Sequence, residues 1–106
     1  MIESIAVDFD NTLYDDKDGK PRTEVINRLI ELQKTGVKLV LWTCRGAEKL
    51  TEAIVWCKQF GLTFDAINED TKEIKARGYL KSPKVMVEYY LDDRAIGIKD
   101  FMELTK

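Results

Sequence analysis

Short apolar runs alternate along the chain with stretches in which apolar residues recur at helical spacing. The runs span residues 5–7, 37–42, 64–67 and 85–91, and their length and their content of β-branched and aromatic residues are typical of strands. Two one-sided apolar stripes between the first three runs predict helices: Val25, Ile26, Leu29 and Ile30 in the first, and Leu50, Ala53, Ile54 and Cys57 in the second. The pattern therefore predicts alternating strands and helices.

Capping residues mark the expected helix ends. Thr23 is the predicted N-cap of the first helix and Gly36 ends it, while Gly46 opens the second helix and Gly61 ends it. Four further segments carry weaker signals: a polar turn at 15–21, a helical turn within 69–78, a short strand at 95–98 and a helical turn at 101–104. No repeat or linker interrupts the pattern, so residues 1–106 are interpreted as a single domain.

The alternation of elements predicts an α/β fold. Crossovers that contain a helix favour parallel pairing of consecutive strands. We therefore expect a Rossmann-like, doubly wound three-layer sandwich with a mainly parallel sheet. In such a sheet the carboxyl ends of the strands share one edge, where ligands bind. Polar residues that follow three of the four strands should converge there: Asp8 and Asp10, Thr43, and Asp92 and Asp93.

Composition narrows the available chemistry. The 106 residues contain no histidine, which excludes Ser-His-Asp and Cys-His catalysis and histidine-ligated zinc. Cys44 and Cys57 are too few for a disulfide framework, so we expect two reduced thiols, with Cys57 in the core. The net charge of −2 gives no general attraction to nucleic acid or to an anionic membrane. No apolar run is long enough to cross a bilayer and no secretion signal is evident, so a cytoplasmic location is expected.

The paired carboxylates predict a metal site. Asp8 and Asp10 repel each other at the end of a buried strand, and Asp92 and Asp93 add to this repulsion if they reach the same edge. A hard divalent cation relieves the repulsion, and Mg²⁺ prefers carboxylate, water and phosphate oxygens. Solvent-facing loop carboxylates are the simpler explanation for one such pair, but a weak one for two pairs at strand ends. We therefore expect Mg²⁺ as the cofactor.

Hydroxyl and basic residues near the same edge suit a phosphate group. Thr43 can donate to a phosphate oxygen, and the N-terminus of the helix that follows favours an anion. Arg45 is either a phosphate contact or a surface charge. Lys84, or alternatively Lys81, precedes the last main strand and can offset phosphoryl charge. Both lysines belong to the basic segment 72–84, for which a solvated face is favoured over a nucleic-acid contact.

Four short motifs resemble those of the haloacid dehalogenase (HAD) superfamily and follow its order. Residues 7–13, Val-Asp-Phe-Asp-Asn-Thr-Leu, match its DxDx(T/V)(L/V) signature in full. Leu41-Trp42-Thr43 is similar to the second motif, Lys84 to the lysine of the third, and Leu91-Asp92-Asp93 to the acidic pair of the fourth. The first motif is the specific one, and together the four span most of the chain. The resemblance implies a HAD-type phosphatase.

The resemblance also implies roles for the matching residues. Asp8 is the implied nucleophile, which becomes an aspartyl-phosphate, and Asp10 is the implied acid and base. Thr43 and Lys84 are the implied phosphoryl ligands, and Lys84 would also orient Asp8. The residues expected around the substrate phosphate are Asn11, Thr43, Arg45 and Lys84. The residues expected to hold Mg²⁺, directly or through water, are Asp8, Asp10, Asp92 and Asp93, with Asp93 favoured over Asp92 as the direct ligand.

The motif spacing leaves no room for the cap domain that HAD members usually carry. Only a turn and one helix fit between Asp10 and Thr43, and one helix, one strand and a charged turn fit between Thr43 and Lys84. An open site suits a bulky or macromolecular phosphate ester, or closure by a second subunit of a homo-oligomer. We therefore predict a capless, Mg²⁺-dependent phosphomonoesterase.

Two alternatives stay open and one is excluded. The chain could be a catalytically silent module that binds phosphate and Mg²⁺. It could also act on 3′-phosphate ends of nucleic acid, because Leu-Asp-Asp-Arg-Ala is similar to a stretch of polynucleotide kinase-phosphatases. A response-regulator receiver is excluded, because its acidic pair precedes its phosphorylated aspartate, whereas here the acidic pair comes last.

Overall fold

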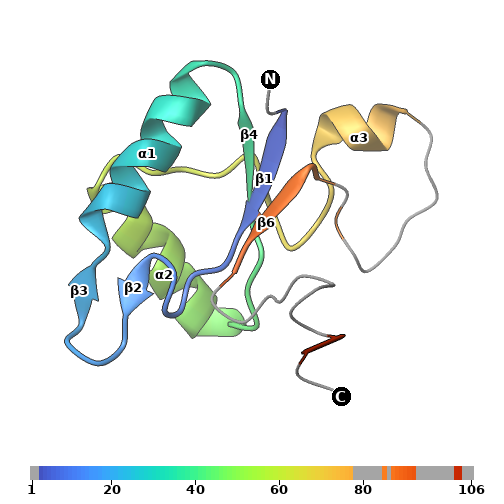
Figure 1. Ribbon diagram of the computed structural model, residues 1–106. Coiled ribbons are helices and arrows are strands. Elements are labelled where there is room, and N and C mark those ends of the chain that lie inside the picture. Colours follow the sequence, from blue (N-terminus) through green and yellow to red (C-terminus); the bar gives the residue numbers. More distant parts are fainter. Residues whose placement is uncertain (1–2, 78–84, 86, 93–101, 104–106) are drawn as a thin grey trace.

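The computed structural model describes residues 3–77, 85, 87–92 and 102–103, and a four-stranded parallel sheet forms its centre (Figure 1). The strand order is β5-β4-β1-β6. The strands are β1 (Ser4–Val7), β4 (Lys38–Leu41), β5 (Ala66–Ile67) and β6 (Tyr89–Leu91). The prediction of an α/β fold with a parallel sheet is confirmed.

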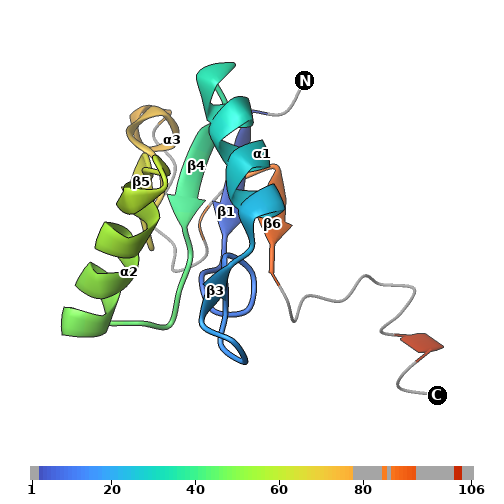
Figure 2. The same cartoon turned by 90° about the vertical axis from the view of Figure 1, so that its left-hand side faces the viewer.

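Helices lie on both sides of this sheet. The helices α1 (Thr23–Lys34) and α2 (Ala47–Gln59) lie on one side, and the short helix α3 (Lys72–Ala76) lies on the other (Figures 1 and 2). Both predicted apolar stripes face the protein interior: Ile26 and Leu29 of α1 are buried, as are Ala53 and Cys57 of α2. The weak signal within 69–78 corresponds to α3. No helix in the described ranges is both long and apolar enough to cross a membrane.

Two apolar clusters cover the two faces of the sheet. Ile5 and Val7 pack in the larger cluster with α1 and α2, whereas Ala6, between them in β1, packs with Val40 and Val85 on the other face. Successive side chains of a strand point to opposite faces. The near-continuous apolar sequence of β1 and β4 is therefore explained by burial on both faces.

The helix ends agree with the sequence at three positions and differ at one. Gly36 and Gly61 follow the C-caps of α1 and α2 with φ angles of 103° and 83°, the left-handed conformation that favours glycine. Gly46 is the N-cap of α2. The predicted N-cap Thr23 is wrong: Arg22 holds that position without a side-chain cap hydrogen bond, and Thr23 is the first helical residue.

Three strand predictions also needed correction. The strand predicted at 64–67 forms only over Ala66–Ile67. The polar segment at 15–21 contains a small antiparallel hairpin, β2 (Tyr14–Asp15) and β3 (Lys20–Pro21), and not only a turn. Of the strand predicted at 85–91, the described residues form β6 over Tyr89–Leu91, which pairs with Ile5–Val7 of β1. The segment 95–98 lies outside the described residues, and of 101–104 only residues 102–103 are described, in helical conformation.

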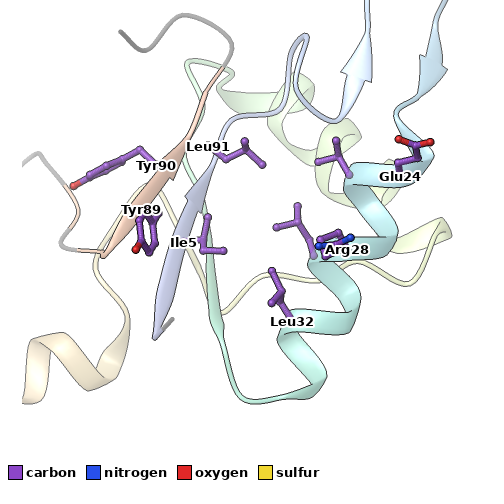
Figure 3. Close-up of a pocket in the computed structure, with 9 residues that line it drawn as sticks. Ile5, Glu24, Arg28, Leu32, Tyr89, Tyr90 and Leu91 are labelled. Carbon is purple, nitrogen blue, oxygen red and sulfur yellow. The ribbon is translucent and has the colours of Figure 1, made fainter. Parts of the chain in front are cut away.

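An apolar cavity of about 500 Å³ lies between α1 and β6 (Figure 3). Its apolar lining comes from both elements and from β1: Ile5, Val25, Leu29, Leu32, Tyr89, Tyr90 and Leu91. Glu24 and Arg28 of α1 also line it. The possibility of a homo-oligomer stays a prediction.

Candidate active site

Residues that directly follow each of the four parallel strands line one cavity of about 520 Å³. Asp8 follows β1, Trp42 follows β4, Asn68 follows β5 and Asp92 follows β6; Thr43 and Cys44 complete the lining. The cavity therefore lies at the carboxyl edge of the sheet, where ligands bind in open α/β folds.

The pairing register of β1 with β6 explains why two carboxylates meet there. Val7 pairs with Leu91, so Asp8 and Asp92, the next residues of two adjacent parallel strands, leave the sheet side by side. The backbone N–H of Asp8 still donates to the carbonyl of Leu91, at 3.0 Å. The side chains of Asp8 and Asp92 are half-buried.

Asn68 holds the backbone of Thr43 and was not predicted as a site residue. Its Oδ1 accepts from the Thr43 N–H at 2.8 Å, and its Nδ2 donates to the Thr43 carbonyl at 3.0 Å. Asn68 adopts a left-handed φ of 52°, which asparagine tolerates better than most residues. The sequence could have indicated Asn68, because it is a polar residue that directly follows the predicted strand 64–67. Asp8, Thr43 and Asp92 were selected because they follow predicted strands in the same way.

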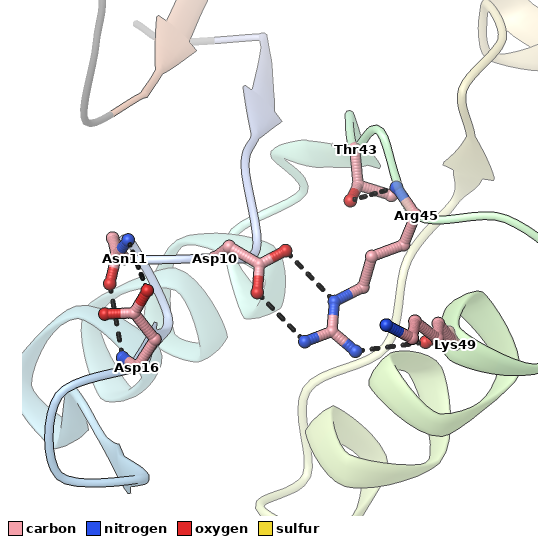
Figure 4. Close-up of polar contacts among 6 residues, drawn as sticks. All are labelled: Asp10, Asn11, Asp16, Thr43, Arg45 and Lys49. Atoms are coloured by element: carbon pink, nitrogen blue, oxygen red, sulfur yellow. Dashed lines mark hydrogen bonds and ion pairs between the residues drawn. The ribbon is translucent and has the colours of Figure 1, made fainter.

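Asp10 and Arg45 form a bidentate ion pair (Figure 4). Arg45 Nε donates to Asp10 Oδ2 at 3.0 Å, and Arg45 Nη2 donates to Oδ1 at 2.9 Å. These hydrogen bonds raise the pKa of the Arg45 guanidinium above its usual value. Arg45 was predicted as either a phosphate contact or a surface charge. In the structure its guanidinium pairs with Asp10, the predicted general acid and base, and its contact with a phosphate stays a prediction.

Asn11 connects the first motif to the β2–β3 hairpin (Figure 4). Its Oδ1 accepts from the backbone N–H of Asp16 at 3.2 Å, and its Nδ2 donates to Asp16 Oδ2 at 3.3 Å. Asn11 has a left-handed φ of 61°, and its backbone N–H donates to the carbonyl of Tyr14. The side chain thus shapes the loop after Asp10, and its contact with a substrate phosphate stays a prediction.

An aromatic cluster supports the ion pair. The rings of Phe9 and Tyr14 stack with centroids 5.6 Å apart, and Trp56 of α2 packs edge-on against both. The Cζ atom of Arg45 lies 4.7 Å from the centroid of the Phe9 ring, within the range of a cation–π contact. Together with Glu52 and Ala53, these residues line a hollow of about 220 Å³, separate from the cavity that Asp8 lines.

The structure brings together only part of the predicted set. Asp8, Thr43 and Asp92 line one cavity, and Asp10 and Arg45 pair beside it, with the backbone N–H of Arg45 donating to Thr43 Oγ1 at 3.1 Å. Three predicted candidates lie outside the described residues: Lys81, Lys84 and Asp93. The catalytic and binding roles of the predicted residues stay predictions.

The donor atoms around the cavity fit a hard cation. Asp8 and Asp92 supply carboxylate oxygens, the ligand type that Mg²⁺ prefers. Within the described ranges no group of three or more His, Cys, Asp or Glu side chains is arranged to hold a metal ion, and the predicted ligand Asp93 falls outside those ranges. Cys44 is an exposed thiol, a soft ligand that Mg²⁺ does not favour, and the thiol of Cys57 is buried in the core, as expected.

The described part of the basic segment carries ion pairs with acidic neighbours. Lys75 Nζ lies 2.7 Å from Glu69 Oε1, and Arg77 Nη2 lies 4.0 Å from Glu3 Oε2. The pKa of Glu73, in the same helix as Lys75, is lowered, first by a hydrogen bond with its own backbone and then by the charge of Lys38. This mixed-charge surface resembles a solvated face more than a polyanion-binding strip.

Comparison with known proteins gives a structural relative. No family model matches the chain, and no curated protein matches it. A solved structure, described as a conserved protein coded by a locus from Bacteroides thetaiotaomicron, is similar with a TM-score of 0.77 and 33% sequence identity, and the match covers 100% of this chain and 93% of that chain. Because the similarity extends over the whole length at this identity, the chain belongs to the same family as the conserved Bacteroides thetaiotaomicron protein.

Proposed function

We propose that this protein is a Mg²⁺-dependent phosphomonoesterase of the HAD type that acts through an aspartyl-phosphate on Asp8. One observation carries the proposal: residues following all four parallel strands line one cavity, and two of them, Asp8 and Asp92, are carboxylates. The threonine that the second motif requires, Thr43, lines the same cavity. The full match of residues 7–13 to the first HAD signature supports the same reaction.

In the first step, a carboxylate oxygen of Asp8 attacks the phosphorus atom of the substrate. A new phosphorus–oxygen bond to Asp8 forms while the bond to the leaving oxygen breaks, and Asp10 gives its proton to that oxygen. The Thr43 hydroxyl donates to a phosphoryl oxygen, and Lys84 offsets the phosphoryl charge. The product alcohol then leaves.

In the second step, water attacks the phosphorus of the aspartyl-phosphate. Asp10, now ionised, takes the proton from the attacking water, and the bond between phosphorus and the Asp8 oxygen breaks. Inorganic phosphate is released, Asp8 returns to its carboxylate form and Asp10 is protonated again. A carboxylate nucleophile and a carboxylic acid are sufficient, which agrees with the absence of histidine.

The oxygen donors Asp8 and Asp92, with Asp93 and the backbone carbonyl of Asp10, are the groups that would hold Mg²⁺. When bound, the ion offsets the negative charge of the two carboxylates and the phosphoryl group. Without this charge, Asp8 would repel the dianionic substrate that it has to attack.

The test compares hydrolysis of p-nitrophenyl phosphate by wild type and by Asp8→Asn and Asp10→Asn, with Mg²⁺ and with EDTA. We expect Asp8→Asn to abolish turnover, Asp10→Asn to lower it by about 100- to 10,000-fold, and EDTA to silence the wild type. Asp18→Asn is the matched control, because Asp18 is an exposed carboxylate of the β2–β3 hairpin whose Oδ1 accepts from the backbone N–H of Lys20. Circular dichroism checks that each variant is folded.

A trapping experiment examines the intermediate directly. Acid quenching during turnover of a ³²P-labelled ester should leave label on the protein that hydroxylamine removes, and Asp8→Asn should carry none. Turnover that persists in Asp8→Asn or in EDTA would refute the mechanism. A folded wild type that hydrolyses none of a broad panel of phosphate esters would instead favour the silent binding module.

The substrate we propose is a bulky or macromolecular phosphate ester. The segment between Asp10 and Thr43 contains only the β2–β3 hairpin, α1 and the sheet strand β4, with no cap domain. Between Thr43 and residue 77, the described chain adds only α2, β5 and α3. The panel therefore includes small sugar phosphates, nucleotides, a phosphopeptide and an oligonucleotide with a 3′-phosphate, and preferential hydrolysis of the last would favour the nucleic-acid alternative.

A further inference from the structure

The contact between Arg45 and Asp10 has the geometry of an orienting interaction. Two nearly parallel N–H···O bonds join the guanidinium to both oxygens of one carboxylate, at 3.0 and 2.9 Å (Figure 4). A bidentate pair fixes the plane of the carboxylate, whereas a single contact leaves it able to rotate. Asp10 lies in the loop after β1, two residues beyond Asp8, so its side chain depends on such a partner for its orientation.

Arg45 is itself held from three directions. Its Nη1 donates to the carbonyl of Lys49 at 3.3 Å, its backbone N–H donates to Thr43 Oγ1 at 3.1 Å, and its guanidinium carbon lies 4.7 Å from the centre of the Phe9 ring. The Arg45 side chain is 22% exposed, half as much as the 44% of the Asp10 side chain. The more exposed carboxylate is therefore paired with the less exposed cation, which has further contacts of its own.

We infer that Arg45 is a positioning residue that holds Asp10 in the orientation needed for proton transfer, and that it is not a phosphate ligand. Each oxygen of the carboxylate accepts one hydrogen bond from Arg45 and keeps a second lone pair for a proton. Arg45 remains charged and gives no proton itself. Arg45 lines the aromatic hollow, and neither Arg45 nor its partner Asp10 is among the described residues that line the cavity of Asp8, Thr43 and Asp92. This inference rests on the proposed function.

The two roles predict different kinetics. Asp10 protonates the leaving oxygen, so its alignment matters most for esters whose alcohol is a poor leaving group, such as alkyl phosphates, and little for p-nitrophenyl phosphate. A phosphate ligand contacts the group that all esters share, so its loss would lower the rates of all substrates similarly and raise KM. The ratio of the two losses therefore separates positioning of Asp10 from phosphate binding.

The experiment measures kcat and KM of wild type, Arg45→Ala, Arg45→Lys, Asp10→Asn and the Arg45→Ala/Asp10→Asn double variant on an alkyl phosphate and on p-nitrophenyl phosphate. We expect Arg45→Ala to lower kcat about 100-fold on the alkyl ester and less than about 10-fold on p-nitrophenyl phosphate, with KM nearly unchanged. Added to Asp10→Asn, the same change should have almost no effect, because both act through one group. Millimolar guanidinium should partly restore Arg45→Ala.

Arg22→Ala is the matched control, because Arg22 forms a long surface ion pair of 3.7 Å with Asp15 outside the cavity. If Arg45→Ala fails to fold, Arg45→Lys decides, since lysine keeps the charge but cannot form the two parallel bonds. Equal losses on both esters with a raised KM, or full additivity with Asp10→Asn, would overturn the inference, and so would wild-type rates in Arg45→Ala. None of these results would contradict the proposed function, provided that Asp8→Asn is inactive. A wild type that hydrolyses neither ester would instead refute the proposed function itself.

Discussion

Replacing Asn68 with alanine should loosen the backbone of Thr43 at the edge of the cavity. The alanine variant loses both hydrogen bonds that join the Asn68 amide to the Thr43 N–H and carbonyl, at 2.8 and 3.0 Å. It also places alanine at a φ of 52°, a conformation that asparagine tolerates through its short polar side chain and alanine does not. Both effects destabilise the folded state, and they can be separated by a second substitution.

The magnitudes follow from the environment of each group. Asn68 is exposed, so water partly replaces its hydrogen bonds, and we take the lower part of the usual range, about 0.5–1 kcal/mol for each bond. The left-handed conformation costs alanine about 1 kcal/mol more than asparagine or glycine. We therefore expect a loss of about 2–3 kcal/mol for Asn68→Ala and of about 1–2 kcal/mol for Asn68→Gly, which keeps the conformation and loses only the bonds.

Urea unfolding followed by circular dichroism measures both values. Asn27→Ala is the control, because Asn27 is an exposed residue of α1 and the same chemical change there should be neutral or slightly stabilising. If Asn68→Gly unfolds at the same urea concentration as wild type, the amide bonds to Thr43 contribute nothing and the reasoning is refuted. If the glycine and alanine variants are equally destabilised, the conformational part is refuted instead.

The remaining predictions concern two buried side chains, Thr12 and Cys57. Thr12 is buried and, within the described residues, its Oγ1 has no hydrogen-bond partner. Thr12→Val should therefore leave the free energy of unfolding unchanged or raise it by about 1 kcal/mol, measured by thermal unfolding. A clear loss of stability would indicate that the hydroxyl has a partner. Burial raises the pKa of the Cys57 thiol to about 12, so a thiol reagent at pH 8 should modify only Cys44 in the native protein and both cysteines in denaturant. Because the pKa of Cys57 is raised in the folded state, its contribution to stability is complete below about pH 9 and falls above that pH by at most about 1.4 kcal/mol per unit. This slope should be absent in Cys57→Val.

The sequence was most informative where local pattern alone decides the structure. The apolar stripes of α1 and α2 and the glycines that end them are visible without knowledge of any tertiary contact, and all were found as predicted. The buried strands β1 and β4 were equally clear, because burial on both faces requires nearly continuous apolar sequence. The convergence of Asp8, Thr43 and Asp92 on one cavity then follows from parallel topology.

Features that depend on a distant partner were not predictable from pattern. β6 forms only where it pairs with β1. Tyr14, the first residue of the hairpin, stacks on Phe9 and packs edge-on against Trp56 of α2. The pair of Asp10 with Arg45 joins side chains from two loops, and no spacing rule specifies which acid a given arginine will reach. Thr23 failed as an N-cap for a related reason, since helical propensity does not fix the first residue of a helix to better than one position.

The topology also predicts that the cavity forms late in folding. β1 and β4 are close in sequence and joined through α1. β6 pairs with the other edge of β1, so the chain that leaves β5 must pass β4 and β1 before Tyr89 can lie opposite Ile5. Such a long-range pairing carries a large loop-closure cost, and only its completion brings Asp92 beside Asp8. Two carboxylates that would repel each other in a partly folded chain are therefore kept apart until the sheet is complete. Charge compensation at this edge is thus required only in the finished fold, where a cation and a phosphoryl group could share it.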